Sequence, residues 1–260
     1  MPGDKTGDLL TKLKSPAVRA QISQSRFLTV SIGGNNLLGP SIAAIFGLWG
    51  IDPEDYDDLD GRDMLTALAA AIDAKYAADP AYNPLDDFSR LMDLTDPVAI
   101  AFHKALLQGV ADFKKEWPAI ASQIRKLNRR CEFYVTTVHN PLSISNSADP
   151  LYPLYLEFET LIGSINLTIR GYALLFGYRV VDAHQAVKYT SGAIDFDIVG
   201  AVAAAALMGQ LGEGHPLYPS YYLTFLQKTD PHPTYIGHTA IYQQLVKVRS
   251  STPSWYWYLR

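Results

Sequence analysis

The sequence lacks the residues that would cross-link the chain or carry it through a membrane. Cys131 is the only cysteine among the 260 residues, which excludes an intramolecular disulfide and a cluster of thiolate metal ligands. The longest nearly charge-free apolar stretch, residues 37–51, is shorter than the roughly 18 to 20 residues that span a bilayer. The first ten residues have no apolar segment typical of a signal peptide. We therefore predict no transmembrane segment.

Basic residues are also scarce. The chain has 22 basic and 26 acidic residues, a formal net charge of -4, and no run of Lys or Arg longer than a pair. Proteins that bind nucleic acid usually carry a basic patch that contacts the phosphate backbone, so we expect no nucleic-acid partner. The content of 48% hydrophobic and 18% charged residues is typical of a globular protein.

Strands and helices alternate in the predicted secondary structure. Runs of β-branched and aromatic residues predict buried strands at 26–32, 131–138 and 178–182, and apolar residues at helical spacing predict helices at 96–130 and 151–176. This order indicates right-handed βαβ units and a parallel sheet covered by helices. We predict an α/β fold with three layers, α/β/α, in a single domain over residues 1–260.

Two stretches, at about 41–95 and 190–228, interrupt this alternation, and we expect both to be insertions near the ligand site. Ligands of parallel sheets bind beyond the carboxyl ends of the strands, so the loops at 33–36, at 139–143 and after Asp182 should share one rim.

The insertions contain apolar segments for which two interpretations stay open. One segment includes Phe46 and Trp49, and the other is the Ala-rich stretch 193–211. They either approach the mouth of the cleft, where they would favour acyl chains over sugars, or they extend the core.

An Asp-Pro-His-Pro sequence begins the most informative segment, residues 230–238. An aspartate two residues before a histidine can orient the imidazole, and the flanking prolines keep the loop extended, which suits a general base. We predict that Asp230 and His232 form such a pair; a solvent-exposed turn is the alternative. His238 is better explained as a residue at the start of the following helix.

A Gly-Gly-Asn-Asn turn, residues 33–36, follows the first predicted strand. A carboxamide on such a turn can direct an N–H into a cleft where an oxyanion develops, which makes Asn35 a candidate donor. A plain turn is the alternative, because glycine and asparagine are common turn residues.

In this order, the two segments resemble those of the SGNH (GDSL) hydrolase family, and the resemblance covers nearly the whole chain. It implies a flavodoxin-like three-layer sheet and cleavage of a carboxylic ester by acyl transfer, without metal or cofactor. It assigns catalytic roles to His232 and Asp230, and oxyanion-hole roles to the Asn35 side chain and the Gly3 N–H. Gly3 comes from the segment Gly-Asp-Lys-Thr-Gly-Asp-Leu-Leu, which looks like the family's second sequence block.

The sequence departs from the family pattern at three points. Asn36 stands where the family usually has Asp, and Asp230 precedes His232 by two residues instead of three. Neither Gly-Asp-Ser nor Gly-x-Ser-x-Gly occurs, so the nucleophilic serine is missing. In the family it lies upstream of the block to which Gly3 belongs. We therefore expect an N-terminally truncated sequence whose sheet lacks its first strands, and an inactive fragment.

The substrate and the compartment stay open at this stage. We expect a small-molecule or lipid ester as substrate, and a secreted protein if a signal peptide lies upstream. The alternative is a non-catalytic carbohydrate- or lipid-binding module on the same fold. Metal-ligand spacing among the histidines and a dinucleotide glycine pattern are both missing from the sequence, so we expect no cofactor.

Overall fold

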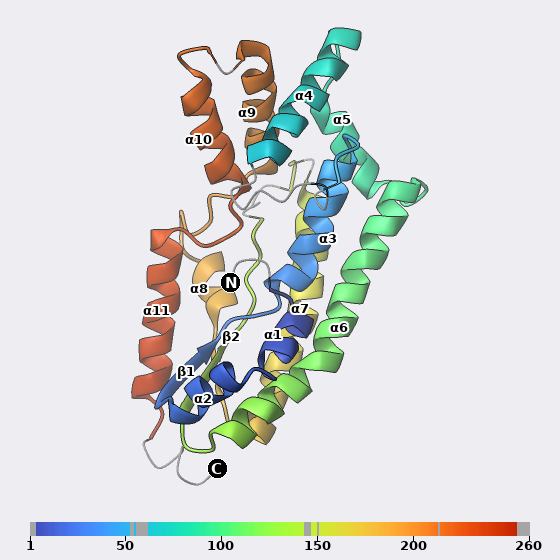
Figure 1. The fold of residues 1–260 in the computed structure, drawn as a ribbon. Helices are drawn as coiled ribbons and strands as arrows, with labels where there is room; N and C mark the ends of the chain where they lie inside the picture. Colours follow the sequence, from blue (N-terminus) through green and yellow to red (C-terminus); the bar gives the residue numbers. More distant parts are fainter. Residues whose placement is uncertain are drawn as a thin grey trace.

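The computed structural model describes residues 4–52, 55, 62–142, 147–149, 151–212 and 214–253. The chain is 67% helical and carries a small sheet (Figure 1). The elements in chain order are α1 (Thr6–Lys12), α2 (Pro16–Gln24), β1 (Phe27–Val30), α3 (Gly34–Gly47), α4 (Arg62–Ala78), α5 (Pro84–Ser89), η2 (Arg90–Met92), α6 (Pro97–Leu127), β2 (Glu132–Thr136), α7 (Tyr152–Phe176), β3 (Arg179–Val181), α8 (Ala183–Lys188), α9 (Ile198–Leu211), α10 (Tyr218–Thr229) and α11 (Tyr235–Ser250).

The three strands form a parallel sheet in the order β1-β2-β3. Leu28 pairs with Phe133 and Val135 with Val180. The three predicted strands and two predicted helices are thus confirmed as strands and helices, and their boundaries differ from the prediction by a few residues. Long helices connect successive strands, as parallel pairing requires.

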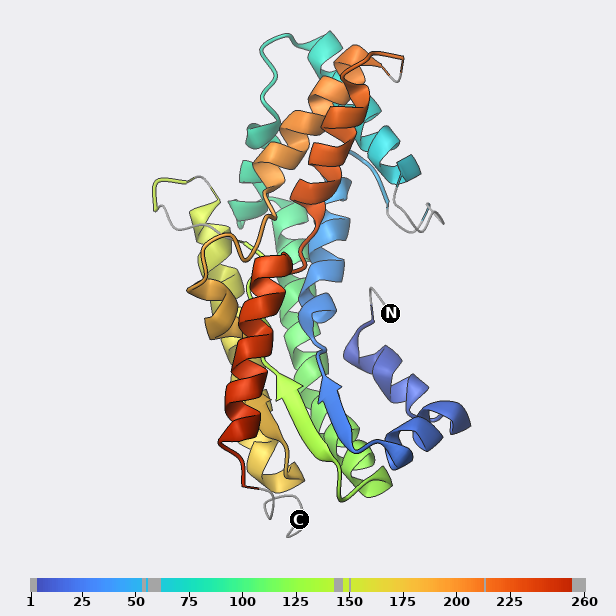
Figure 2. The same cartoon turned by 90° about the vertical axis from the view of Figure 1, so that its left-hand side faces the viewer.

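Helices lie on both faces of this sheet, and Figure 2 shows α11 on one face with α6 and α7 on the other. On the α11 face, Arg249 of α11 forms an ion pair with Glu132, with Nε 2.8 Å from Oε2. On the opposite face, the guanidinium of Arg125 of α6 lies 5.3 Å from the ring centre of Phe133. The alternation of side chains along β2 therefore directs one set of residues to each helical layer.

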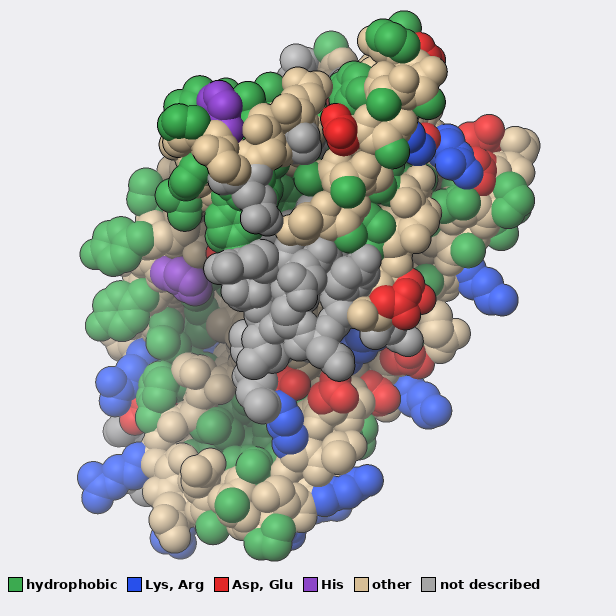
Figure 3. Space-filling model, turned by 45° about the horizontal axis from the view of Figure 1, so that its top comes forward, with side chains coloured by type: hydrophobic (Ala, Val, Ile, Leu, Met, Phe, Trp, Pro, Cys, Tyr) green, Lys and Arg blue, Asp and Glu red, His purple; other side chains and the backbone are tan. Residues whose placement is uncertain are grey.

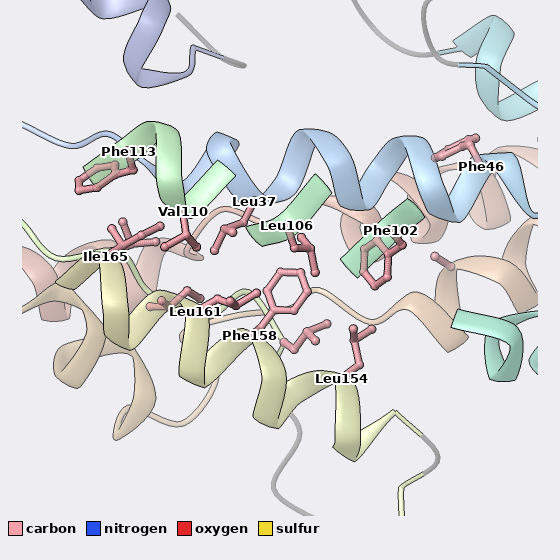
Figure 4. Packing of buried hydrophobic residues seen from close by; sticks show 14 of the residues in the cluster. Leu37, Phe46, Phe102, Leu106, Val110, Phe113, Leu154, Phe158, Leu161 and Ile165 are labelled. Atoms are coloured by element: carbon pink, nitrogen blue, oxygen red, sulfur yellow. The ribbon is translucent and has the colours of Figure 1, made fainter. Parts of the chain in front are cut away.

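The core lies mainly between α3, α6 and α7 (Figure 4). The helix α6 begins at Pro97, where the Asp96 side chain accepts a hydrogen bond from the Val98 N–H at 2.8 Å, and it continues through Pro118. Its apolar face packs against its neighbours through fully or almost fully buried side chains. These include Phe102, Leu106, Phe113, Trp117, Ile120 and Ile124.

The helices α4, α5, α9 and α10 form a cap beyond the carboxyl ends of the strands, where α9 packs against both α4 and α10 (Figure 1). The cap comes from the two stretches, 41–95 and 190–228, that interrupt the predicted alternation. Ala201, Ala204 and Ala205 of α9 are buried, and such small side chains allow close packing between helices.

The predicted three-layer, flavodoxin-like α/β/α fold is wrong. The protein is mostly helical, with a parallel sheet of three strands. The physical reason is that the interrupting stretches fold into long helices that pack on each other, so that helix–helix contacts dominate the structure.

Candidate functional site

A groove of about 470 Å³ lies along β1 and opens at the carboxyl end of the sheet. Gly33, Asn35, His139 and His232 are among its lining residues. Two of the loops predicted to share a rim, at 33–36 and at 139–143, therefore contribute to one groove through their described residues. The chain after Asp182 forms the helix α8 and not a loop, and it lines a neighbouring cavity instead.

Asp230 and His232 form the predicted carboxylate–imidazole pair. His232 Nδ1 lies 2.7 Å from Asp230 Oδ1, and the same oxygen accepts the His232 backbone N–H at 2.9 Å. The side chains are 58% and 60% exposed, respectively, so water reaches both. The carboxylate fixes the orientation of the ring and leaves Nε2 as the nitrogen available to a substrate.

The loop that carries this pair is held at both ends. Asp230 ends α10, and Thr234 begins α11 by accepting the Gly237 N–H at 3.3 Å. Thr234 also donates its N–H to the Ala193 carbonyl at 2.8 Å and its hydroxyl to the Gly192 carbonyl at 2.6 Å. These bonds anchor the loop to the chain segment that leads into α9.

His139 is a third member of the site. Its loop was expected at this rim, but its contact with the loop of Asp230 and His232 was not. Its Nε2 lies 3.2 Å from the Pro231 carbonyl oxygen, so it donates a hydrogen bond to the backbone between Asp230 and His232. Burial lowers the pKa of His139 to about 4, and the bond to Pro231 acts in the opposite direction. His139 is therefore neutral near pH 7. No local pattern could have shown this contact, because the residues are 92 positions apart.

Asn35 and Asn36 have different roles. Asn35 lines the groove, and its Nδ2 donates to the Asp4 carbonyl at 3.1 Å; the carboxamide nitrogen carries a second N–H. Asn36 is only 3% exposed. It accepts the Thr6 N–H at 3.2 Å and donates to the Gly109 carbonyl at 3.3 Å, so it joins α1, α3 and α6. Of the two, Asn35 is the residue that can reach a ligand.

Gly33 makes the turn before α3 possible. Its φ is +107°, and a Cβ at this position would lie 2.6 Å from Phe113 Cε2. A larger residue would meet both backbone strain and a steric clash. The turn places Asn35 in the first turn of α3, at the carboxyl end of β1.

Gly3, the second predicted oxyanion donor, lies outside the described residues. Ser31 lines the same groove and is exposed. Thr137 also lines it, but its side chain is buried and donates to Asp182 Oδ1 at 3.1 Å. Among the described residues, no hydroxyl group lies within hydrogen-bonding distance of the His232 ring.

A narrow apolar slot of about 30 Å³ adjoins the groove. The two share Leu38, Pro141, Phe158 and Pro231, so the slot continues the groove between α3 and α7. Of the two interpretations left open for Phe46 and Trp49, their burial favours extension of the core over approach to the cleft. Both are 7% exposed and belong to the core.

A separate polar cavity of about 390 Å³ lies beyond the sheet on the α8 side. Glu159 in this cavity pairs with Lys188, with Oε2 2.7 Å from Nζ, and accepts from Asn140 at 3.1 Å. Contacts with Lys188, Asn140 and His184 lower the pKa of Glu159, although burial alone would raise it. Within the described ranges, no three His, Cys, Asp or Glu side chains are placed to hold a metal ion.

The surface of the cap differs from that of the sheet end. Hydrophobic side chains are common on the surface of the α9–α10 end, where few charged side chains appear (Figure 3). Leu217 and Leu223 there are 51% and 60% exposed. Even so, none of the helices in the part of the chain that the structure covers is long and apolar enough to cross a bilayer.

Comparisons with known proteins give no relative: no family model, no curated protein and no solved structure matches the chain.

Proposed function

We propose that the chain carries the base and oxyanion-binding part of an ester hydrolase that works by acyl transfer. The observation that supports this most is the 2.7 Å contact between Asp230 and His232 beside the groove that also holds Asn35. A carboxylate-oriented imidazole and a carboxamide donor facing one groove are the groups that acyl transfer requires.

The proposed reaction proceeds in two halves. A serine hydroxyl from outside the described chain attacks the ester carbonyl carbon, and His232 Nε2 takes the hydroxyl proton. An Asn35 N–H stabilises the tetrahedral oxyanion, and Asp230 stabilises the imidazolium. His232 then gives the proton to the leaving alcohol as the ester C–O bond breaks. Water hydrolyses the acyl-serine by the same proton transfers in the second half.

The substrate class that we propose is an ester with an apolar acyl group. Leu38 and Phe158 line both the groove and the slot that continues it. Each buried CH₂ group of an acyl chain contributes roughly 0.8 kcal/mol to binding, so apolar walls favour longer chains.

Turnover of p-nitrophenyl esters by the 260-residue chain tests this proposal. We expect slow hydrolysis without a burst and without inhibition by a serine-directed phosphonate, because His232 has no serine to activate among the described residues and acts as a base toward water alone. A burst that the phosphonate abolishes would place the nucleophile inside the chain. Comparison of Ser31→Ala with Ser23→Ala, a serine on α2, would then decide whether Ser31 is that nucleophile.

The second candidate is a lipid-binding module without catalysis, and the apolar lining of the groove favours it. This function predicts saturable binding of a fatty acid that His232→Ala leaves unchanged, and no hydrolysis above that of free imidazole. The hydrolase predicts hydrolysis that depends on His232.

A further inference from the structure

The polar cavity of about 390 Å³ on the α8 side is separate from the groove that carries the candidate base. It is lined by residues of α7 and α8, by the loop after β2, and by residues 189–192 and 194. Of the described residues, none lines both this cavity and the groove. Its volume lies in the range of small-molecule pockets, roughly 300–1,000 Å³, so it is large enough for a ligand of its own.

An ion pair faces this cavity. Glu159 Oε2 lies 2.7 Å from Lys188 Nζ, and Glu159 Oε1 accepts from Asn140 Nδ2 at 3.1 Å. His184 Nε2 lies 3.2 Å from the same Oε1 atom, and it donates, because a carboxylate can only accept. The hydrogen bond to Glu159 raises the pKa of Lys188. Both members of the pair are therefore charged near neutral pH, and their charges cancel.

This pairing decides which ligands suit the cavity. Apart from His184, which is charged only when protonated, the remaining described residues of the lining carry no charged side chain. A charged ligand would have to separate Glu159 from Lys188 or stay unpaired itself, and a partly buried charge without a partner is costly. A hydroxyl group both donates and accepts, so it can bind to the carboxylate and the ammonium while they stay paired. The cavity therefore favours a neutral ligand with several hydroxyl groups.

Aromatic rings complete the lining. Tyr155 and Tyr189 both line the cavity, and Tyr189 is 76% exposed. Ser191 lines it as well, and its hydroxyl has no hydrogen-bond partner among the described residues. A pyranose sugar has C–H groups on its faces and hydroxyl groups at its edge. Such a ring can cover the apolar surface of a tyrosine while its hydroxyl groups bind to the polar side chains.

One wall of the cavity is fixed by the protein's own hydrogen bonds. The Ala193 N–H donates to the Thr190 carbonyl at 3.1 Å, and Gly192 between them has a φ of +72°. The Gly192 carbonyl accepts the hydroxyl of Thr234 at 2.6 Å, which ties this turn to the start of α11. A site whose wall is already in place loses little conformational entropy when a ligand binds.

We propose that this cavity binds a neutral sugar in its pyranose form, with the ion pair of Glu159 and Lys188 as its hydrogen-bonding partner and Tyr189 against its ring. The inference does not depend on the proposed ester hydrolysis, because the cavity and the groove have different lining residues.

Binding of matched sugars to the full chain tests the proposal. The probes are methyl pyranosides of glucose, galactose and mannose, each in a neutral form, as the uronate anion and as the 6-amino cation. Saturation-transfer NMR measures their dissociation constants. We expect at least one neutral glycoside to bind with a Kd of about 1 mM, as its small size allows, and at least fivefold more tightly than both of its charged forms. No binding of any neutral glycoside, or tighter binding of a charged form, would overturn the proposal.

Two variants test the role of the ion pair. Glu159→Gln leaves Lys188 without its charged partner, so the preference should change to the uronate. Lys188→Gln leaves the Glu159 carboxylate unpaired, so the preference should change to the amino sugar. Circular dichroism checks the fold of both variants. If Glu159→Gln fails to fold, Lys188→Gln, at an exposed position, decides alone. An unchanged preference for the neutral sugar in a folded variant would overturn the assigned role of the pair.

A matched pair of tyrosine variants locates the site. Tyr189→Ala removes a ring that lines the cavity and should weaken the neutral sugar at least fivefold. Tyr242→Ala removes a ring that is 63% exposed on α11 and does not line the cavity, so binding should be unchanged. Equal effects of the two variants would contradict binding in this cavity. Because none of these experiments measures ester hydrolysis, their failure is distinguishable from failure of the proposed function.

Discussion

The Nε2 atom of His139 and the carbonyl oxygen of Pro231 lie 3.2 Å apart, and this contact ties the loop after β2 to the loop that carries Asp230 and His232. A carbonyl oxygen can only accept, so His139 carries its proton on Nε2 and binds as a donor. The histidine thus positions the backbone on which the candidate base depends.

The environment of His139 predicts a pH dependence of stability. Burial lowers the pKa of His139 in the folded protein to about 4, from 6.5 when exposed. As the pH falls from about 6.5 to about 4, the unfolded chain binds a proton that the folded chain does not, and the free energy of unfolding decreases. The native protein should lose roughly 1–3 kcal/mol more over this range than His139→Gln, which keeps an N–H donor.

Urea denaturation at pH 7, 5.5 and 4.5 measures this difference. His215→Gln, at a half-exposed position away from the site, is the control for loss of a histidine and should follow the native curve. Identical pH profiles of the native protein and His139→Gln would contradict a lowered pKa of His139 in the folded protein.

The turn before α3 predicts a contrast between two adjacent glycines. Gly33→Ala combines a φ of +107° with a contact of 2.6 Å to Phe113 and should lower the free energy of unfolding by roughly 2–4 kcal/mol. Gly34→Ala meets no heavy atom within 4 Å and begins α3, so its effect should stay within about 1 kcal/mol. Equal effects in chemical denaturation would argue against this turn geometry.

The burial of Phe46 and Trp49 predicts effects on stability. Trp49 donates from Nε1 to the Tyr82 hydroxyl at 2.9 Å and contacts Phe88 edge to face. Phe46→Ala and Trp49→Ala should each lower the free energy of unfolding by roughly 3–5 kcal/mol. Ile42→Ala, at a half-exposed residue that lines the slot, should cost about 1 kcal/mol. A Trp49→Ala variant as stable as the native chain would be inconsistent with this packing.

Cys131 should be inert in the folded protein. Its side chain is 1% exposed, and burial raises the pKa of the thiol, although Arg125 acts in the opposite direction. Because the thiolate is the reactive form, Ellman's reagent should label the native chain at least about 100-fold more slowly than the chain in urea. The absorbance of the released thiolate, followed over time with and without urea, gives the two labelling rates. Similar rates would show that Cys131 is accessible in the folded protein.

The three strands and the helices α6 and α7 were predictable from the sequence because each has a local signal. A run of aromatic and β-branched residues marks β2, and Asp96-Pro97 with helical spacing marks α6. The overall fold was not predictable, because α9 is apolar on almost all sides and its pattern does not say which helix it packs against. Its contacts with α4 join segments far apart in the sequence. Such helix–helix contacts make the structure mostly helical.

In the candidate site, too, contacts between residues close in sequence were predictable, and contacts between distant segments were not. Asp230 and His232 are two residues apart, so a local turn is sufficient to bring them together. The contacts of Asn35 with Asp4 and of His139 with Pro231 connect distant segments, and single-sequence periodicity carries no information about them. The different roles of Asn35 and Asn36 also depend on the packing of α1 and α6 against α3.

The most direct test of the account compares the residual ester hydrolysis of His232→Ala and His238→Ala at pH 7.5. His232 lies beside Asp230 at the groove, whereas His238 is exposed on α11 and does not line the groove. If His232 is the base, His232→Ala should lower the rate with p-nitrophenyl acetate by at least tenfold, and His238→Ala should change it by less than twofold. A His232→Ala variant that retains the native rate, or a larger loss in His238→Ala, would contradict the assignment of Asp230 and His232 as the catalytic pair.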